Sequence, residues 1–304
     1  MLNESDIISK IAQLMPRSPL QINKVFESDS EIIERDGKFL LFNIDEFSHE
    51  DRFCENNGYD LGWNIAVGTL SDIYASGGKP ELFGCSLTVN KMFDEKYILD
   101  FAQGIADVLN IAGVSFIGGD FGKSGKGNEW RAACFAVGKT DKPIKRSGAK
   151  SGDNIYITGE IGSGNYQAVG ISSRFELRTC PEGVTACTDT SDGLWNGINN
   201  IAKQSGAGFE LFDIPYCEKI PVEFHKLLRK ELLMFCECGE YELLFTSPLE
   251  INDGRYKKIG KITGNPNDKF LNGKDISGFN IRARDYKSVI KYVLAVKKKC
   301  DELL

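Results

Sequence analysis

Histidine is scarce in this chain, with two among 304 residues, and there is neither a long uncharged apolar run nor an excess of basic residues. A hydrolase built on a histidine base is therefore not expected. No run approaches the roughly 20 apolar residues of a membrane-spanning helix, and residues 1–6 lack the basic and apolar regions of a signal peptide. The net charge of −6 disfavours binding to nucleic acid or to an anionic membrane. We expect a cytoplasmic protein with no nucleic-acid or membrane partner.

The nine cysteines are an odd number and are scattered, mostly in apolar surroundings such as those of Cys134. This pattern predicts reduced, buried thiols rather than a disulfide framework. Cys236 and Cys238 form the one close pair, but their spacing is wrong for a zinc knuckle and no histidine lies nearby. The sequence favours no metal or redox role for this pair.

Helical and strand patterns alternate through both halves of the chain, which favours an α/β or α+β architecture. The length fits two domains of about 150 residues each. Residues 139–152 are polar, basic and broken by proline and glycine, as linkers are. We therefore predict an N-terminal domain over residues 1–140 and a C-terminal domain over residues 146–304.

Several acidic residues fall where predicted elements end. A strand over 38–44 leads to Asp45, a helix over 61–75 carries Asp72 in its last turn, and a buried strand over 114–117 leads to Asp120. A carboxylate in the last turn of a helix is disfavoured by the helix dipole, so Asp72 needs a compensating partner. Carboxylates this far apart in sequence converge only through folding, and hard cations such as magnesium, often with a polyphosphate, are the usual reason to gather them.

Asp189 and Asp192 lie three positions apart where a strand-like run gives way to an amphipathic helix. One interpretation is metal ligation beside an anion at the helix N-terminus. The other is that one of the two is an ordinary N-cap. The residues alone leave both open.

The remaining motifs also admit two interpretations each. Gly118 and Gly119 would let the backbone approach a phosphate, or would form a plain turn followed by a solvated Asp120. Asp45 begins either a ligand cluster or a solvated acidic loop, in which His49 contacts substrate or has no role. The glycine-rich segment 159–164 lacks the lysine of a Walker A motif.

Taken together, five segments resemble the aminoimidazole ribonucleotide (AIR) synthetase superfamily: residues 70–80, 117–120, 146–153, 189–194 and 241–246. Their order and spacing match its thiamine-monophosphate kinase branch best. The resemblance implies a homodimer, whose N-terminal α/β domains form a barrel-like interface, and a layered C-terminal α/β domain. It also implies ATP bound between the domains, with Mg²⁺ held by aspartates.

Carried over by motif, the resemblance assigns the following roles. The expected metal ligands are Asp29, Asp45, Asp72, Asp120 and Asp192. Gly118, Gly119, Asp120, Asp189 and Ser191 would bind the nucleotide, Asp120 and Asp192 would act in catalysis, and His49 and Phe53 would contact the acceptor substrate. This set fits phosphoryl transfer, in which metals and positioning do most of the work.

The chain departs from that branch on the acceptor side. One N-terminal carboxylate is missing around Asp29, the residues from Ser48 to Phe53 differ from the usual acidic loop, and the late Gly-Gly-Glu-Asp motif has become Glu237-Cys238-Gly239-Glu240. The default acceptor is thiamine monophosphate. A kinase of another small heterocyclic phosphate or riboside, such as α-ribazole, is the alternative, and a catalytically inactive ATP-binding regulator is the rival from another class.

Overall fold

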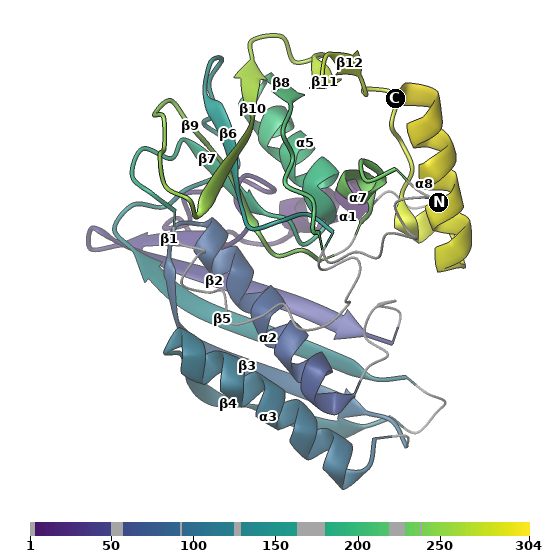
Figure 1. Cartoon of the computed structure of the whole chain (residues 1–304). Helices are drawn as coiled ribbons and strands as arrows, with labels where there is room; N and C mark the ends of the chain where they lie inside the picture. Colours follow the sequence, from purple (N-terminus) through teal and green to yellow (C-terminus); the bar gives the residue numbers. More distant parts are fainter. Residues whose placement is uncertain are drawn as a thin grey trace.

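The computed structural model of this protein describes residues 4–49, 57–91, 93–124, 129–162, 180–218, 229–237 and 239–304. Two β-sheets organise them, one in each half of the chain (Figure 1). The fold is therefore mixed α/β, as the sequence predicts. No helix in these ranges is long and apolar enough to cross a membrane.

The first sheet has the strand order β1-β2-β5-β3-β4. Its strands are β1 (Glu31–Arg35), β2 (Lys38–Ser48), β3 (Lys79–Val89), β4 (Ser115–Lys123) and β5 (Arg131–Thr140). All neighbours pair antiparallel except β3 and β4, which are parallel and joined through a helix. Helices α2 (Gly58–Ala75) and α3 (Glu95–Ala112) cover one face of this sheet (Figure 1). The opposite face carries no described helix.

Two sequence predictions need correction in this sheet. The strand expected to end before Asp45 continues to Ser48, so Asp45 lies within β2. The strand preceding Gly118 is not buried, since Phe116 is 57% and Ile117 54% exposed. The reason is that β4 is an edge strand, which the apolar pattern of the sequence cannot reveal.

Helices α2 and α3 approach each other unusually closely because glycines line their contact. A Cβ atom on Gly62 would lie 2.0 Å from the carbonyl oxygen of Phe101, and one on Gly104 would lie 2.0 Å from that of Tyr59. Backbone atoms cannot move aside as a flexible side chain can. This contact fixes α2, which carries Asp72, against the rest of the domain.

We expect Gly62→Ala to lower the free energy of unfolding by about 1–3 kcal/mol, the usual cost of overpacking. Chemical denaturation would measure it. Gly254→Ala is the matched control, because nothing lies within 4 Å of a Cβ atom there. Equal stability of the two variants would contradict the close packing of α2 on α3.

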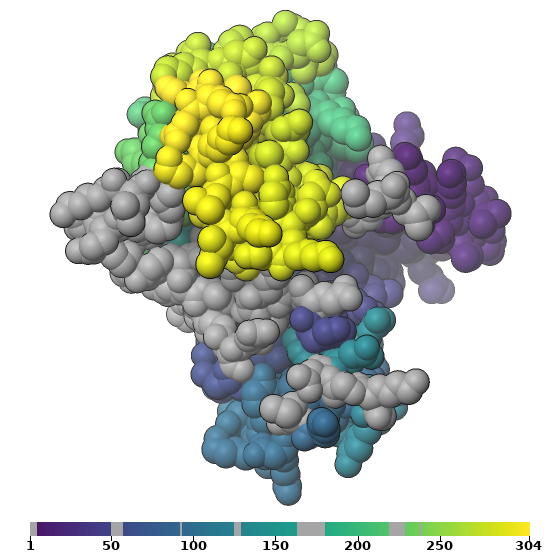
Figure 2. All heavy atoms as spheres, turned by 90° about the vertical axis from the view of Figure 1, so that its right-hand side faces the viewer, coloured from purple at the N-terminus to yellow at the C-terminus, as the bar shows by residue number. Residues whose placement is uncertain are grey.

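The second sheet has the order β12-β11-β8-β10-β6-β9-β7. Its strands are β6 (Asn154–Thr158), β7 (Ala186–Asp189), β8 (Gly208–Leu211), β9 (Leu243–Ser247), β10 (Tyr256–Thr263), β11 (Lys269–Leu271) and β12 (Lys274–Asp275). Helices α5 (Gly193–Ser205), α7 (Leu232–Phe235) and α8 (Val289–Leu303) share its apolar core, and the 3₁₀ turn η2 (Ala283–Asp285) precedes α8. Figure 2 shows the C-terminal residues in yellow over this part of the molecule, with the blue residues of the first sheet below.

The two halves are not separate in their packing. The core around α2 includes Tyr156, Val184, Leu243 and Phe245 from the second half. As a result α2 is buried on nearly all sides rather than along one stripe. The first sheet ends at Thr140 and the second begins at Asn154, so the predicted linker falls between them, while the division into domains 1–140 and 146–304 stays a prediction.

The N-terminal helix, the cap of α3 and the cysteines complete the description of the fold. Helix α1 comprises residues Glu4–Leu14. Asp94 caps α3 by accepting a hydrogen bond from the Tyr97 backbone at 2.7 Å. The cysteines in the described ranges are free thiols, and all but Cys180 are buried. Cys238 lies outside the described residues.

Candidate functional site

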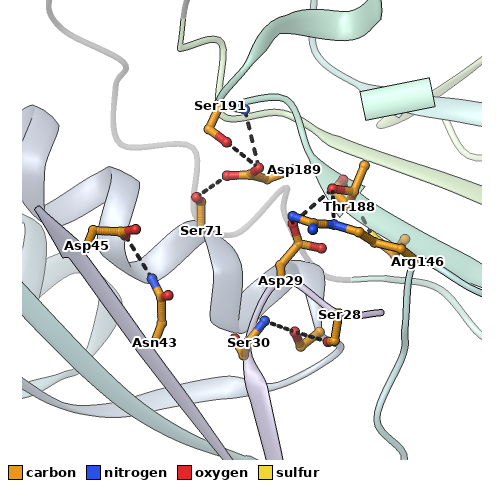
Figure 3. A network of polar contacts seen from close by, with 12 residues as sticks. Ser28, Asp29, Ser30, Asn43, Asp45, Ser71, Arg146, Thr188, Asp189 and Ser191 are labelled. Atoms are coloured by element: carbon orange, nitrogen blue, oxygen red, sulfur yellow. Dashed lines mark hydrogen bonds and ion pairs between the residues drawn. The ribbon is translucent and has the colours of Figure 1, made fainter. Parts of the chain in front are cut away.

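Three carboxylates from distant parts of the chain meet between the two sheets, and Figure 3 shows two of them, Asp29 and Asp189. Asp29 lies in the turn before β1, Asp72 in the last turn of α2, and Asp189 at the end of β7. Each residue contributes one carboxylate oxygen to a group in which all three oxygens lie within 4.8 Å of one another. We call these three residues the carboxylate cluster.

The side chain of Asp29 is enclosed, since it is 1% exposed. Its Oδ1 accepts hydrogen bonds from Arg146 Nη2 at 2.6 Å and from Thr188 Oγ1 at 2.8 Å. Its Oδ2 is buried and has no hydrogen-bond partner among the described residues. Burial and the charge of Asp189 raise the pKa of Asp29, against the lowering effect of Arg146.

Asp72 has an even less favourable setting for a negative charge. Burial, followed by the charges of Asp189 and Asp45, raises its pKa well above the usual value. It also lies at the C-terminal end of a helix, where the dipole disfavours a carboxylate. Arg146 provides part of the compensation that the sequence calls for, and the sum of charges still favours a cation.

Asp189 is held in place by three donors. Ser71 Oγ donates to its Oδ2 at 2.5 Å, and Ser191 donates to its Oδ1 from the hydroxyl at 2.6 Å and from the backbone at 3.3 Å. Ser71 comes from α2 and Ser191 from the loop before α5, so this carboxylate ties the two halves together. Ser191, predicted to bind nucleotide, thus positions a neighbouring carboxylate.

Asp45 and Asp192 surround the carboxylate cluster. Burial raises the pKa of Asp45 to about 6, with a hydrogen bond from Asn43 at 2.8 Å opposing and the charges of Asp189, Asp29 and Asp192 adding to it. Desolvation by the surrounding protein raises the pKa of Asp192, and the negative charges of Asp189 and Glu237 raise it further. Both side chains therefore belong to the same acidic neighbourhood.

The choice between cap and ligand for Asp189 and Asp192 can now be narrowed. Helix α5 begins at Gly193, directly after Asp192, as predicted. The side chain of Asp192 makes no capping hydrogen bond, and that of Asp189 accepts from Ser71 and Ser191. Neither residue has a side-chain cap bond, which leaves both carboxylates available for a ligand.

The backbone of this loop is held by buried glutamates. The backbone N–H of Thr190 donates to the Glu242 carbonyl at 2.9 Å, and the backbone N–H of Glu242 donates to Thr190 Oγ1 at 2.9 Å. The Glu242 carboxylate accepts from Thr158 Oγ1 at 2.6 Å, and that of Glu240 accepts from the Gly162 backbone at 2.7 Å. These contacts fix the segment that presents Asp189 and Asp192.

Asp120 is not brought to the carboxylate cluster. Asp45 pairs with Cys134, Cys134 with Cys85, and Cys85 with Gly119 across four neighbouring strands. Because side chains alternate along a strand, Asp120 points to the opposite face of the sheet from Asp45, about 14 Å away at three strand spacings. Asp120 and Gly119 are exposed, so Asp120 does not lie beside Asp45 within one chain, and its role as a metal and nucleotide ligand stays a prediction.

The acceptor-side candidates are placed less fully. His49 is exposed just after β2, and its backbone N–H donates to the Trp130 carbonyl at 3.3 Å. Phe53 lies outside the described residues. Nothing in the described part of the chain brings His49 to the carboxylate cluster.

Sequence reasoning gave no role to Arg146, Thr188 or Ser71, although the structure places all three at the carboxylate cluster. Arg146 also donates from Nε to Thr188 Oγ1 at 3.2 Å. Ser71 and Arg146 lie in segments that carry the family resemblance, and Thr188 and Ser71 directly precede a cluster aspartate. Adjacency to those aspartates was the available signal.

The carboxylate cluster offers the kind of ligand atoms that a hard cation takes. Oxygen ligands from carboxylates are what Mg²⁺ prefers, and the unpartnered Oδ2 of Asp29 is a buried acceptor that needs a positive partner. A single arginine, Arg146, faces Asp29 and Asp72, and the pKa values of these two carboxyl groups are raised. The donor set therefore fits a hard divalent cation.

Comparison with known proteins finds similarity to one family model over part of the chain and to several curated proteins. A model described as AIR synthase related protein, N-terminal domain, matches residues 27–140. The thiamine-monophosphate kinase of Aquifex aeolicus is 26% identical over 264 residues, which cover 75% of this chain and 82% of that protein. The thiamine-monophosphate kinase of Methanopyrus kandleri is 27% identical over 286 residues, 86% of this chain and 89% of that protein.

Solved structures show the same fold. AaThiL complexed with AMPPCP and TMP has a TM-score of 0.78 and 22% identity, and the match covers 89% of this chain and 93% of that one. The HypE-HypF complex has a TM-score of 0.68 and 16% identity, covering 88% of this chain and 96% of that one. This chain therefore shares its two-sheet fold with those structures.

Proposed function

We propose that this chain, a member of the AIR synthase-related superfamily in its thiamine-monophosphate kinase branch, transfers the γ-phosphoryl group of ATP to thiamine monophosphate. The observation that carries the proposal is the carboxylate cluster, which lies between the two sheets of a fold shared with AaThiL complexed with AMPPCP and TMP. The reaction would place the protein in cofactor biosynthesis.

The arrangement suits phosphoryl transfer, which depends on positioning and on charge neutralisation rather than on a covalent nucleophile. The carboxylate cluster would hold Mg²⁺, with Asp45 and Asp192 beside it, and the bound ion would neutralise phosphate charge. Arg146 and Thr188 orient Asp29, while Ser71 and Ser191 orient Asp189. We propose that Asp192 acts in the metal and phosphate shell, since it follows Asp189 at the start of α5.

We also propose a homodimer formed by the face of the first sheet that α2 and α3 leave open. Phe42 and Ile44 of β2 point to this face, and Ile44 is 78% exposed. Their neighbours Val137 and Phe135 on β5 share it. Asp120 lies on the same face, so its proposed role in the site would be played toward the partner.

Ile44→Lys is expected to convert the dimer into a monomer, because it buries a charge at the centre of an apolar contact. Light scattering after size-exclusion chromatography would measure the mass. Leu294→Lys is the control, since Leu294 is also exposed, at 57%, but lies on α8. A wild-type chain that is monomeric at micromolar concentration would contradict the proposed dimer.

The function is tested by ADP release from ATP and Mg²⁺ with thiamine monophosphate as acceptor. Turnover with thiamine monophosphate and none with α-ribazole is the expected result. Turnover with α-ribazole and none with thiamine monophosphate would make α-ribazole the acceptor. ATP binding without turnover on any acceptor would favour a catalytically inactive regulator. We expect the reaction to occur in the cytoplasm, in keeping with the free thiols.

A further inference from the structure

A cavity lies at the C-terminal end of α2, where Tyr74, Gly77 and Gly78 line it. Its volume is about 750 Å³, within the range of small-molecule sites. It opens where β2 and β3 begin and β5 ends, beside the segment that leads to β7. We call it the lysine cavity, and its lining is Lys38, Tyr74, Gly77, Gly78, Lys79, Lys139, Thr140, Asp141, Lys142, Ile144 and residues 180–184.

The lysine cavity gathers positive charge in a chain whose net charge is −6. Four lysines line it, against the carboxylates of Asp141 and Glu182. Lys79 and Lys139 are direct cross-strand partners, an arrangement that costs free energy between like charges. Among the described residues Lys139 pairs with Glu81, whereas Lys38, Lys79 and Lys142 form no ion pair.

Neutralising the C-terminus of α2 does not account for these lysines. The carbonyl of Gly77 accepts from Thr140 Oγ1 at 2.8 Å, that of Ser76 accepts from the Ile144 backbone at 3.0 Å, and that of Ile73 accepts from the Gly78 backbone at 3.0 Å. The end of the helix is thus capped by the backbone and a threonine. Lys38, Lys79 and Lys142, which pair with no carboxylate among the described residues, therefore remain available to an anion.

Part of the wall of the lysine cavity is apolar. Tyr74, Ile144, Pro181 and Val184 contribute to its wall. A site with a lysine rim and an apolar wall suits a phosphate that carries an organic body. The lysines are positively charged, whereas the carboxylate cluster is negatively charged. An organic phosphate would therefore bind in the lysine cavity without a metal ion.

We propose that the lysine cavity is a second, metal-independent binding site for an organic diphosphate or triphosphate of nucleotide size. The lysines hold the phosphate groups as point charges, and the apolar wall packs against the organic part. The site is separate from the proposed kinase site, and neither proposal depends on the other.

The test is a calorimetric titration of the full-length protein with inorganic pyrophosphate in EDTA. Without divalent cations the carboxylate cluster repels pyrophosphate, so any binding reports on the lysine cavity. The expected result is one pyrophosphate per chain, with an affinity that falls as salt increases. No binding in EDTA would overturn the proposal.

The variant K79A/K142A should weaken pyrophosphate binding roughly tenfold or more, the loss of charge-assisted hydrogen bonds. K257A/K261A removes the same charge from β10, outside the cavity, and should bind as the wild type does. If both variants bound pyrophosphate equally weakly, the effect would come from net charge alone, and the proposed site would be wrong. A thermal melt confirms that each variant is folded.

The apolar wall is tested by comparing ATP with pyrophosphate under the same metal-free conditions. ATP should bind several times more tightly, and Val184→Ser should remove that advantage while leaving pyrophosphate binding unchanged. If ATP binds no better than pyrophosphate, the organic part makes no contact and the proposed ligand class is wrong. Asp72→Asn should leave both titrations unchanged, which separates this site from the kinase site.

Discussion

Asp72→Asn is expected to lower turnover about 10³-fold while making the metal-free protein more stable. The loss follows because a metal that neutralises phosphate charge contributes several kcal/mol, and each ~1.4 kcal/mol is a factor of ten in rate. The gain follows because Asp72 is buried and repelled by Asp189, Asp45 and Asp29. A neutral amide of nearly the same shape removes that repulsion.

The two effects are measured by ADP release and by thermal unfolding in EDTA. A rise in Tm of about 1.5 °C corresponds to roughly 1 kcal/mol for a chain of 304 residues. Asp36→Asn is the control, since Asp36 is exposed in the turn between β1 and β2. A variant that keeps wild-type turnover would exclude Asp72 from the site, and one that is less stable would show that its charge is not repelled.

The second large effect is a loss of metal-free stability as the pH rises. Asp29, Asp72 and Asp45 have raised pKa values in the folded state, that of Asp45 to about 6. Their value in the unfolded chain is about 3.9. The folded state therefore binds more protons in this range, and stability falls as the pH rises from about 4 through 6 and above.

Magnesium should reverse this trend. At pH 5.5 protons compete with the metal for the carboxylates, whereas at pH 7.5 the ion replaces them. We expect Tm in EDTA to fall between pH 5.5 and pH 7.5, and added Mg²⁺ to raise Tm more at the higher pH. Melting curves with and without Mg²⁺ measure both.

The double variant D29N/D72N is the internal control for this linkage. It should flatten the dependence of Tm on pH in EDTA and abolish the stabilisation by Mg²⁺. A Tm in EDTA that stays constant or rises between pH 5.5 and pH 7.5 in the wild type would contradict the raised pKa values as the source of instability.

The aspartates of the carboxylate cluster can be predicted from the sequence more readily than the residues that contact them. Asp72 and Asp189 are predictable because a helix pattern and a strand pattern end at them. Asp29 enters only through the family resemblance. Arg146 could not be assigned a role, because its partner Asp29 lies 117 positions away and no local pattern links the two.

Asp120 marks the opposite case, a motif that the sequence singles out and that the fold separates from the others. Its segment Gly118-Gly119-Asp120 follows an apolar run, which predicts a buried strand end near the site. The partner of β4 on one side is β3, and no strand among the described residues pairs with its other side. Strand order decides that outcome, and strand order is a long-range property.

By itself the sequence determined the mixed α/β class, the helices over Asp72 and after Asp192, the free buried thiols and the family resemblance, because apolar period, caps and composition are local. Only the tertiary structure decided which acidic residues share a site. It brought Asp29, Asp72 and Asp189 together, turned Asp120 to the other face of the sheet, and gathered four lysines around one cavity. Those outcomes depend on strand pairing and on the alternation of side chains across it, which join residues far apart in the chain.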